Sequence, residues 1–125
     1  MENEFFYKEE TQRIIGLCYE VHNILGKGLL EIVYKEALQY EFELNGIIFE
    51  REKEYLIEYK GKILEHKFHA DFVVFNKVIL EIKSCSNLVE QHFSQVINYL
   101  RISKTKIGLL IILDKIQFKS KRFAV

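Results

Sequence analysis

The chain contains no proline and no tryptophan, and it has two cysteines among its 125 residues. The missing proline and tryptophan exclude no class of function, but the cysteine content does carry information. Cys18 and Cys85 have no further cysteines at the spacing of a disulfide framework or a zinc site. We therefore expect free thiols and a reducing compartment, the cytoplasm.

Long apolar runs are also missing, since no window reaches the roughly 18 apolar residues of a membrane span. The first four residues lack the basic start of a secretory signal, so neither a membrane location nor secretion is expected. Apolar residues make up 49% of the chain and charged residues 29%, as in ordinary globular proteins. A chain of this length predicts one domain, residues 1–125.

The formal net charge is zero, but the two halves of the chain differ. Residues 1–65 hold 14 acids and 8 bases, whereas residues 66–125 hold 4 acids and 10 bases. A basic half can attract phosphate backbones. The alternative is that these lysines only solvate strand ends and block edge pairing. The neutral total argues against tight, non-specific duplex binding by a monomer.

Hydrophobic spacing predicts three helices, at residues 9–25, 29–44 and 87–102. The expected apolar face of the first helix carries Ile14, Cys18, Val21 and Ile24. The expected apolar face of the second helix begins at Leu30. Alternating or continuous apolar segments predict strands at 47–59, 62–71, 107–113 and 116–123, together with a hairpin within 69–83. The order of elements indicates an α/β (α+β) protein with a mixed sheet flanked by helices.

The hairpin carries Asp71 on its first strand and Glu81 and Lys83 on its second. Charged residues are rarely buried without partners, so their place inside apolar strands needs a reason. One interpretation is a Mg²⁺ or Mn²⁺ site, because carboxylate oxygens suit these ions and a lysine can orient or deprotonate an attacking water. The other is a half-exposed strand end with a surface Glu–Lys pair, which is usually worth under about 1 kcal/mol.

The spacing of the two acids sets a geometric condition. A two-residue turn at Asn76 and Lys77 would pair Asp71 with Ile82 and direct Asp71 and Glu81 to opposite faces. A shared site therefore needs an odd-length loop, a bulge or a break in the strand near Asp71. We predict one of these.

Asp71, Glu81 and Lys83 resemble the motif of the PD-(D/E)XK nuclease superfamily, with Ala70 in place of its proline. A longer resemblance joins them, because Gly28-Leu29-Leu30-Glu31-Ile32-Val33-Tyr34 matches the G-x-x-E-x-x-Y signature of the GxxExxY family, a branch of that superfamily. The resemblance extends over roughly residues 10–123. It implies the restriction-endonuclease-like αβββαβ core.

The resemblance also implies roles for single residues. Asp71 and Glu81 bind Mg²⁺ or Mn²⁺, Glu31 adds a ligand or holds a water beside the metal, and Lys83 positions or activates the nucleophile. Gln95 and Tyr99 match a Gln-x-x-x-Tyr pattern of RecB-like nucleases and contact substrate.

The expected activity is hydrolysis of nucleic-acid phosphodiester bonds, with DNA favoured over RNA, by a protein that could form a homodimer. The alternative is a catalytically silent nucleic-acid-binding or protein-interaction module that retains the nuclease fold. A zinc site is not expected, because His66 and His69 do not share a face of a strand and no cysteine pair completes the set.

Overall fold

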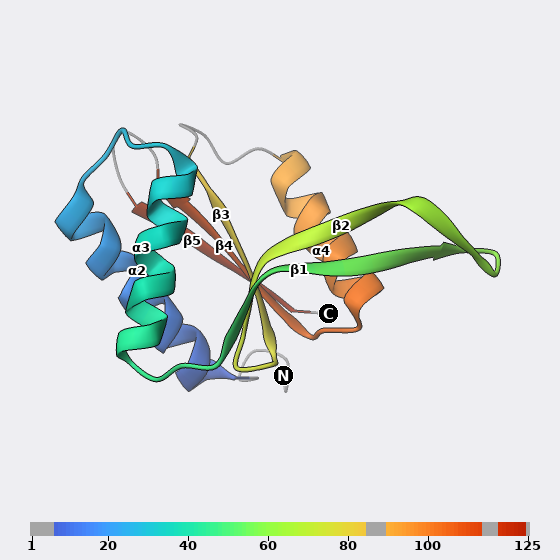
Figure 1. Cartoon of the computed structure of the whole chain (residues 1–125), viewed down its shortest axis with the longest axis horizontal. Helices are drawn as coiled ribbons and strands as arrows, with labels where there is room; N and C mark the ends of the chain where they lie inside the picture. Colours follow the sequence, from blue (N-terminus) through green and yellow to red (C-terminus); the bar gives the residue numbers. More distant parts are fainter. Residues whose placement is uncertain (1–6, 85–89, 114–117, 125) are drawn as a thin grey trace.

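The computed structural model describes residues 7–84, 90–113 and 118–124 and has three helices and five strands there (Figure 1). The helices are α2 (Lys8–Leu25), α3 (Glu31–Leu44) and α4 (Glu90–Ser103). The strands are β1 (Phe49–Tyr59), β2 (Lys62–Val74), β3 (Val78–Lys83), β4 (Ile107–Leu113) and β5 (Phe118–Ala124). Cys85, the start of the helix predicted at 87–102 and the start of the strand predicted at 116–123 lie outside the described residues.

The strands form one mixed sheet in the order β1-β2-β3-β4-β5. Strand β3 is parallel to β4, and the other neighbouring pairs are antiparallel. Helix α4 makes the crossover that a parallel pair requires. Every residue of β4 is buried, which confirms the prediction from its continuous apolar run.

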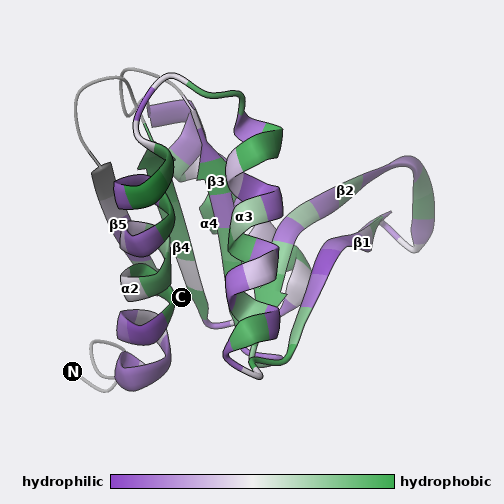
Figure 2. Cartoon of the chain, turned by 60° about the vertical axis from the view of Figure 1, so that its left-hand side comes forward, coloured by the Kyte–Doolittle hydropathy of each residue, from purple (hydrophilic) through white to green (hydrophobic). Residues whose placement is uncertain are grey.

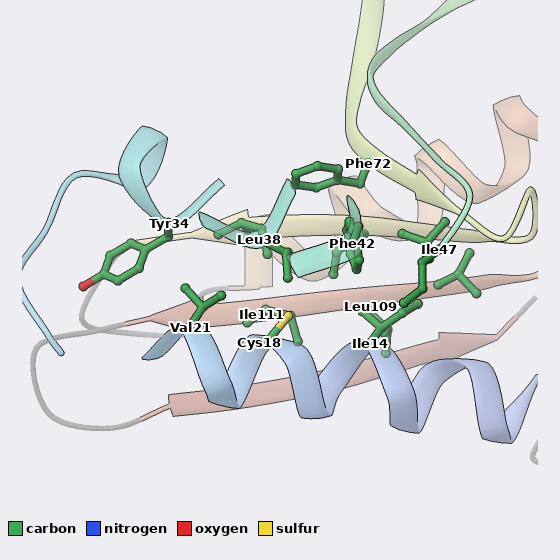
Figure 3. Close-up of a cluster of buried hydrophobic side chains, with 14 of the residues drawn as sticks. Ile14, Cys18, Val21, Tyr34, Leu38, Phe42, Ile47, Phe72, Leu109 and Ile111 are labelled. Carbon is green, nitrogen blue, oxygen red and sulfur yellow. The ribbon is translucent and has the colours of Figure 1, made fainter. Parts of the chain in front are cut away.

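Helices α2 and α3 cover one face of the sheet. Ile14, Cys18 and Val21 of α2 meet Leu38 and Phe42 of α3 over the sheet (Figure 3). Cys18 is a buried free thiol, as expected. Two predicted core positions are wrong, because Ile24 and Leu30 are 69% and 73% exposed.

Helix α4 covers the opposite face, where Val96 and Leu100 pack on Ile79 and Leu110. The contact is close at Gly108 of β4, where an added Cβ would lie 2.8 Å from Cγ1 of Val96. A side chain at residue 108 would therefore push α4 away from the sheet.

The outer part of the β1–β2 hairpin leaves the sheet and projects beyond α4 (Figure 1). Hydrophilic and hydrophobic residues alternate along this arm (Figure 2). The charged run at residues 50–54 belongs to β1, which is an edge strand. In the described part of the chain, no helix is long and apolar enough to cross a membrane.

Candidate metal and catalytic site

The loop of the β2–β3 hairpin has three residues, Phe75 to Lys77, and this odd length sets the register. Val74 pairs with Val78 and Phe72 with Leu80, so Asp71 comes opposite Glu81 rather than Ile82. Phe75 and Asn76 adopt left-handed backbone angles, with φ of 58° and 57°. Of the three predicted alternatives the structure has the odd-length loop, and this loop brings the two carboxylates to the same place.

The regular ladder between β2 and β3 ends at Phe72 and Leu80, and side-chain carboxylates continue it. The backbone N–H of Asp71 donates to Oε2 of Glu81 at 2.8 Å, and the N–H of Ile82 donates to Oδ2 of Asp71 at 2.8 Å. Both carboxyl groups are buried. Because each carboxylate satisfies the backbone of the other strand, the two acids are fixed where β2 parts from β3.

The side chains of strand β2 also switch from one face of the sheet to the other at Asp71. Phe72 packs in the core under α2 and α3, whereas Ala70 and Phe68 pack in the core under α4. In a regular strand these three residues would share one face. Glu52 of β1, opposite Asp71 between two regular pairs, has a φ of 54°, which is uncommon for a residue other than glycine. The distortion at Glu52 and Asp71 sends the hairpin arm outward.

The G-x-x-E-x-x-Y segment directs Glu31 to the place where β2 parts from β3 at Asp71 and Glu81, which we call the fork. The Tyr34 hydroxyl donates to the carbonyl of Gly26 at 2.7 Å and accepts from the N–H of Leu29 at 3.2 Å. Gly28 has a φ of 90°, a conformation that glycine adopts without strain. The buried tyrosine therefore holds the loop before α3, and the helix begins at Glu31, two residues later than predicted.

Lys35, one turn after Glu31, is a member of the site that the sequence reasoning missed. Its Nζ lies 2.7 Å from Oδ1 of Asp71, 3.5 Å from Oε2 of Glu31 and 3.6 Å from Oε1 of Glu52. Its side chain is only 10% exposed. Burial lowers the pKa of Lys35, but the hydrogen bond and charge of Asp71 and the charges of the two glutamates raise it above its usual value. Lys35 is thus a buried cation that joins Glu31 to Asp71.

Glu81 is the acid whose ionisation is most disfavoured. Burial, followed by the charge of Asp71, raises the pKa of Glu81 to about 8. The Asp71 N–H, Lys83 and Lys35 oppose this shift. Lys83, which follows Glu81 by two residues on β3, is partly exposed. It therefore has access both to Glu81 and to solvent.

Helix α4 carries the two residues that were predicted to contact substrate. Gln95 and Tyr99 line an open hollow of about 540 Å³ along α4, together with Glu90, Gln91, Ser94 and Asn98. Burial, followed by the charges of Glu81 and Asp71, raises the pKa of Tyr99, so its hydroxyl lies within reach of their field. The Tyr99 ring stacks on Phe68 at 3.9 Å, and Phe68 stacks on Tyr55 at 4.9 Å.

A second hollow, of about 360 Å³, lies beyond Tyr55. Four lysines line it, Lys53, Lys77, Lys104 and Lys106, together with Tyr7, Tyr55, Val73, Asn76, Ser103 and Thr105. We call it the lysine hollow. The stacked rings of Tyr55, Phe68 and Tyr99 connect it to the hollow along α4.

The donor set fits a divalent cation in chemistry and in charge. Glu31, Glu52, Asp71 and Glu81 face Lys35 and Lys83, so four carboxylates share the site with two ammonium groups. When all are ionised, two negative charges remain in excess, and Mg²⁺ or Mn²⁺ would balance them. Among the described residues, no three acidic, histidine or cysteine side chains already form a metal-binding group. Lys35 occupies the space between Asp71 and Glu31 instead.

Comparisons with known proteins agree with this fold. A family model for the PD-(D/E)XK nuclease superfamily matches residues 8–123. A crystal structure of SSO0001 superposes with a TM-score of 0.61 at 23% sequence identity, covering 94% of this chain and 60% of that one. The present chain thus spans three fifths of that protein, and the likeness shows the fold alone. No curated protein matches the chain.

Proposed function

Because the chain belongs to the PD-(D/E)XK nuclease superfamily, we propose that it is a metal-dependent nuclease whose site is Asp71, Glu81 and Lys83. The observation that carries this proposal is the fork of β2 and β3, where two buried carboxylates lie together beside a lysine. Burying two acids side by side costs stability unless a cation compensates. Such an arrangement is typical of a functional site.

In this proposal Asp71 and Glu81 hold Mg²⁺ or Mn²⁺, and Glu31 adds a ligand or holds a water. The cation would stabilise negative charge on the phosphate that is attacked. Lys83, partly exposed next to Glu81, orients the attacking water as an ammonium group or, after giving its own proton to solvent, takes up the proton of that water. Attack forms a new P–O bond in line with the P–O bond that breaks, and the leaving oxygen takes a proton from solvent water. Gln95 and Tyr99 position the phosphate from α4.

Nucleic acid is the substrate that the surface supports best. The hollow along α4, the stacked rings and the lysine hollow follow one another over one side of the molecule. Lysines bind phosphates, and bases stack on exposed aromatic rings. Tyr55 and Tyr99 are partly exposed, whereas Phe68 between them is buried. We propose DNA rather than RNA as the substrate.

We further place the chain in the GxxExxY branch, with residues 1–125 as one nuclease domain. The contacts that Tyr34 makes with Gly26 and Leu29 give its signature a structural reason. A homodimer is part of the proposal, because cutting both strands of a duplex needs two sites. Exposed apolar side chains at Ile24, Leu30 and Ile32 offer a contact surface for it. Light scattering of the purified protein measures the oligomeric state.

The test is cleavage of single- and double-stranded DNA and RNA with Mg²⁺ or Mn²⁺. We expect Asp71→Asn and Lys83→Met to lower cleavage on the order of a hundredfold or more, and chelator to abolish it. Glu58→Gln and Lys62→Met are matched controls from the exposed outer arm of the hairpin and should cut like wild type. Circular dichroism checks that each variant is folded.

A wild type that binds Mn²⁺ but cuts none of the four substrates would favour the non-catalytic module. The same conclusion follows if folded Asp71→Asn protein cuts as fast as wild type, since the cleavage would then come from elsewhere.

A further inference from the structure

Lys35 sits at the point where the proposed metal site needs positive charge. Its Nζ is 2.7 Å from Asp71, and its side chain is as buried as that of Asp71, at 10% and 9% exposure. An ammonium group so placed compensates Asp71 without any metal. It also occupies one of the carboxylate oxygens that a metal would use, namely Oδ1.

We propose that Lys35 is a tethered counter-ion of Asp71, which a divalent cation must displace, and that Glu52 receives the displaced ammonium group. The inference rests on the proposed function, because it assumes that Asp71 is a metal ligand. It goes further in assigning to Lys35 the control of metal affinity, and to Glu52 the role of an alternative partner.

Glu52 provides a second carboxylate to which the displaced ammonium group of Lys35 can move. Glu52 lies 3.6 Å from Nζ and is 49% exposed, so it lies on the solvent side of the ammonium group. A lysine has a flexible four-carbon stem and three donors that rotate, so it can exchange carboxylate partners without moving the backbone. Glu52 is held there by an uncommon backbone conformation, with a φ of 54°, directly opposite Asp71. Residues kept in such conformations are often functional.

Displacement has a consequence for metal binding. A cation that enters next to Asp71 meets the positive charge of Lys35 at short range, and this repulsion weakens binding until the ammonium group moves away. Lys35 therefore keeps the carboxylates in place in the metal-free protein and lowers their affinity for metal. Lys35 is a positioning residue in this account.

The test is the affinity for Mn²⁺ alone, measured by electron paramagnetic resonance of the free ion, without nucleic acid. Lys35→Met should bind Mn²⁺ about tenfold more tightly than wild type, or tighter still. Lys62→Met, which removes an exposed lysine from the outer arm of the β1–β2 hairpin instead, is the matched control and should leave the affinity unchanged. If Lys35 were merely structural, Lys35→Met would bind Mn²⁺ no more tightly than wild type, and that result would overturn the proposal.

A double-mutant cycle tests the part played by Glu52. Glu52→Gln should weaken Mn²⁺ binding about threefold in the wild type, because the displaced lysine loses its partner, and should have little effect in Lys35→Met. An equal loss in both backgrounds would show that Glu52 acts on the metal directly and would overturn its assigned role.

A measurement on the wild type covers the case in which Lys35→Met does not fold. Acetylation of Lys35, followed by mass spectrometry, should be faster in saturating Mn²⁺ than in chelator, with Lys62 as the internal reference. Unchanged labelling while Mn²⁺ is bound would contradict displacement and leave the proposed nuclease function intact. If neither wild type nor Lys35→Met binds Mn²⁺, the metal site itself fails.

Discussion

Glu81 is the residue whose environment is least suited to a free carboxylate. Burial and the nearby Asp71 raise its pKa to about 8, against an ordinary value of 4.5. The folded metal-free protein therefore keeps a proton on Glu81 that the unfolded chain releases near pH 4.5. This contribution to stability is present below pH 4.5 and is lost as pH rises through 8.

The pH dependence of stability follows from this shift. Between pH 5.5 and 8.5, wild type should lose roughly 2–3 kcal/mol relative to Glu81→Gln, which has no proton to release. Urea unfolding in chelator at the two pH values measures the difference. Parallel pH profiles for the two proteins would mean that Glu81 is ionised in the fold at neutral pH.

Tyr99 combines a packing role, which its ring performs, with the proposed substrate role, which its hydroxyl group performs. Tyr99→Phe keeps the ring that stacks on Phe68 and removes the hydroxyl that lies in the field of Glu81 and Asp71. We expect unfolding free energy to change by less than about 1 kcal/mol, because the stack remains. Cleavage should fall about tenfold. Full activity of Tyr99→Phe would leave the tyrosine with packing alone.

The sequence identifies some residues of the site and misses others for a physical reason. Asp71, Glu81 and Lys83 stand out because they interrupt apolar strands. Lys35 and Glu52 lie among other charged residues, where an exposed surface is the ordinary expectation. The spacing of four between Glu31 and Lys35 was an available signal, since such pairs meet on a helix. The burial of Lys35 against Asp71 depends on the bend at Asp71, which no local pattern encodes.

At the scale of elements, the packing of α4 on β4 positions Gln95 and Tyr99. Gly108→Ala should destabilise the protein by about 1–3 kcal/mol, because the new methyl group meets Val96 at 2.8 Å. The same change at Gly16, in α2 with nothing within 4 Å, should stabilise by about 0.5–1 kcal/mol. Thermal unfolding of the two variants measures the difference in sign, and equal effects would contradict the close approach of α4.

Periodicity predicts the elements well and their irregularities poorly. The apolar spacing of α2 and the continuous run of β4 indicate both their type and their extent. The odd loop at residues 75–77 was inferable only by assuming that Asp71 and Glu81 share a site. The exposure of Ile24 and Leu30 was not foreseen, because Tyr34 holds the intervening loop and delays the start of α3.

At the scale of the whole molecule, the proposed path of the nucleic acid includes the lysine hollow, which is lined by residues other than the proposed catalytic ones. Replacing Lys104 and Lys106 together by alanine should weaken binding of the cleaved nucleic acid and reduce the salt slope by roughly one to two ions. Neither Asp71 nor Glu81 lines the hollow, so the cleavage rate at saturating substrate should stay close to that of wild type. Fluorescence anisotropy at several salt concentrations tests this, with Lys62→Ala as control. An unchanged salt slope would remove the lysine hollow from the substrate path.

The central claim is that Asp71 and Glu81 form one cation site where β2 parts from β3. Calorimetric titration with Mn²⁺ tests it most directly, on wild type and on folded Asp71→Asn and Glu81→Gln. The account predicts saturable binding by wild type that each substitution weakens about a hundredfold, with Glu58→Gln unchanged. Binding that survives both substitutions, or no binding by wild type, would contradict it.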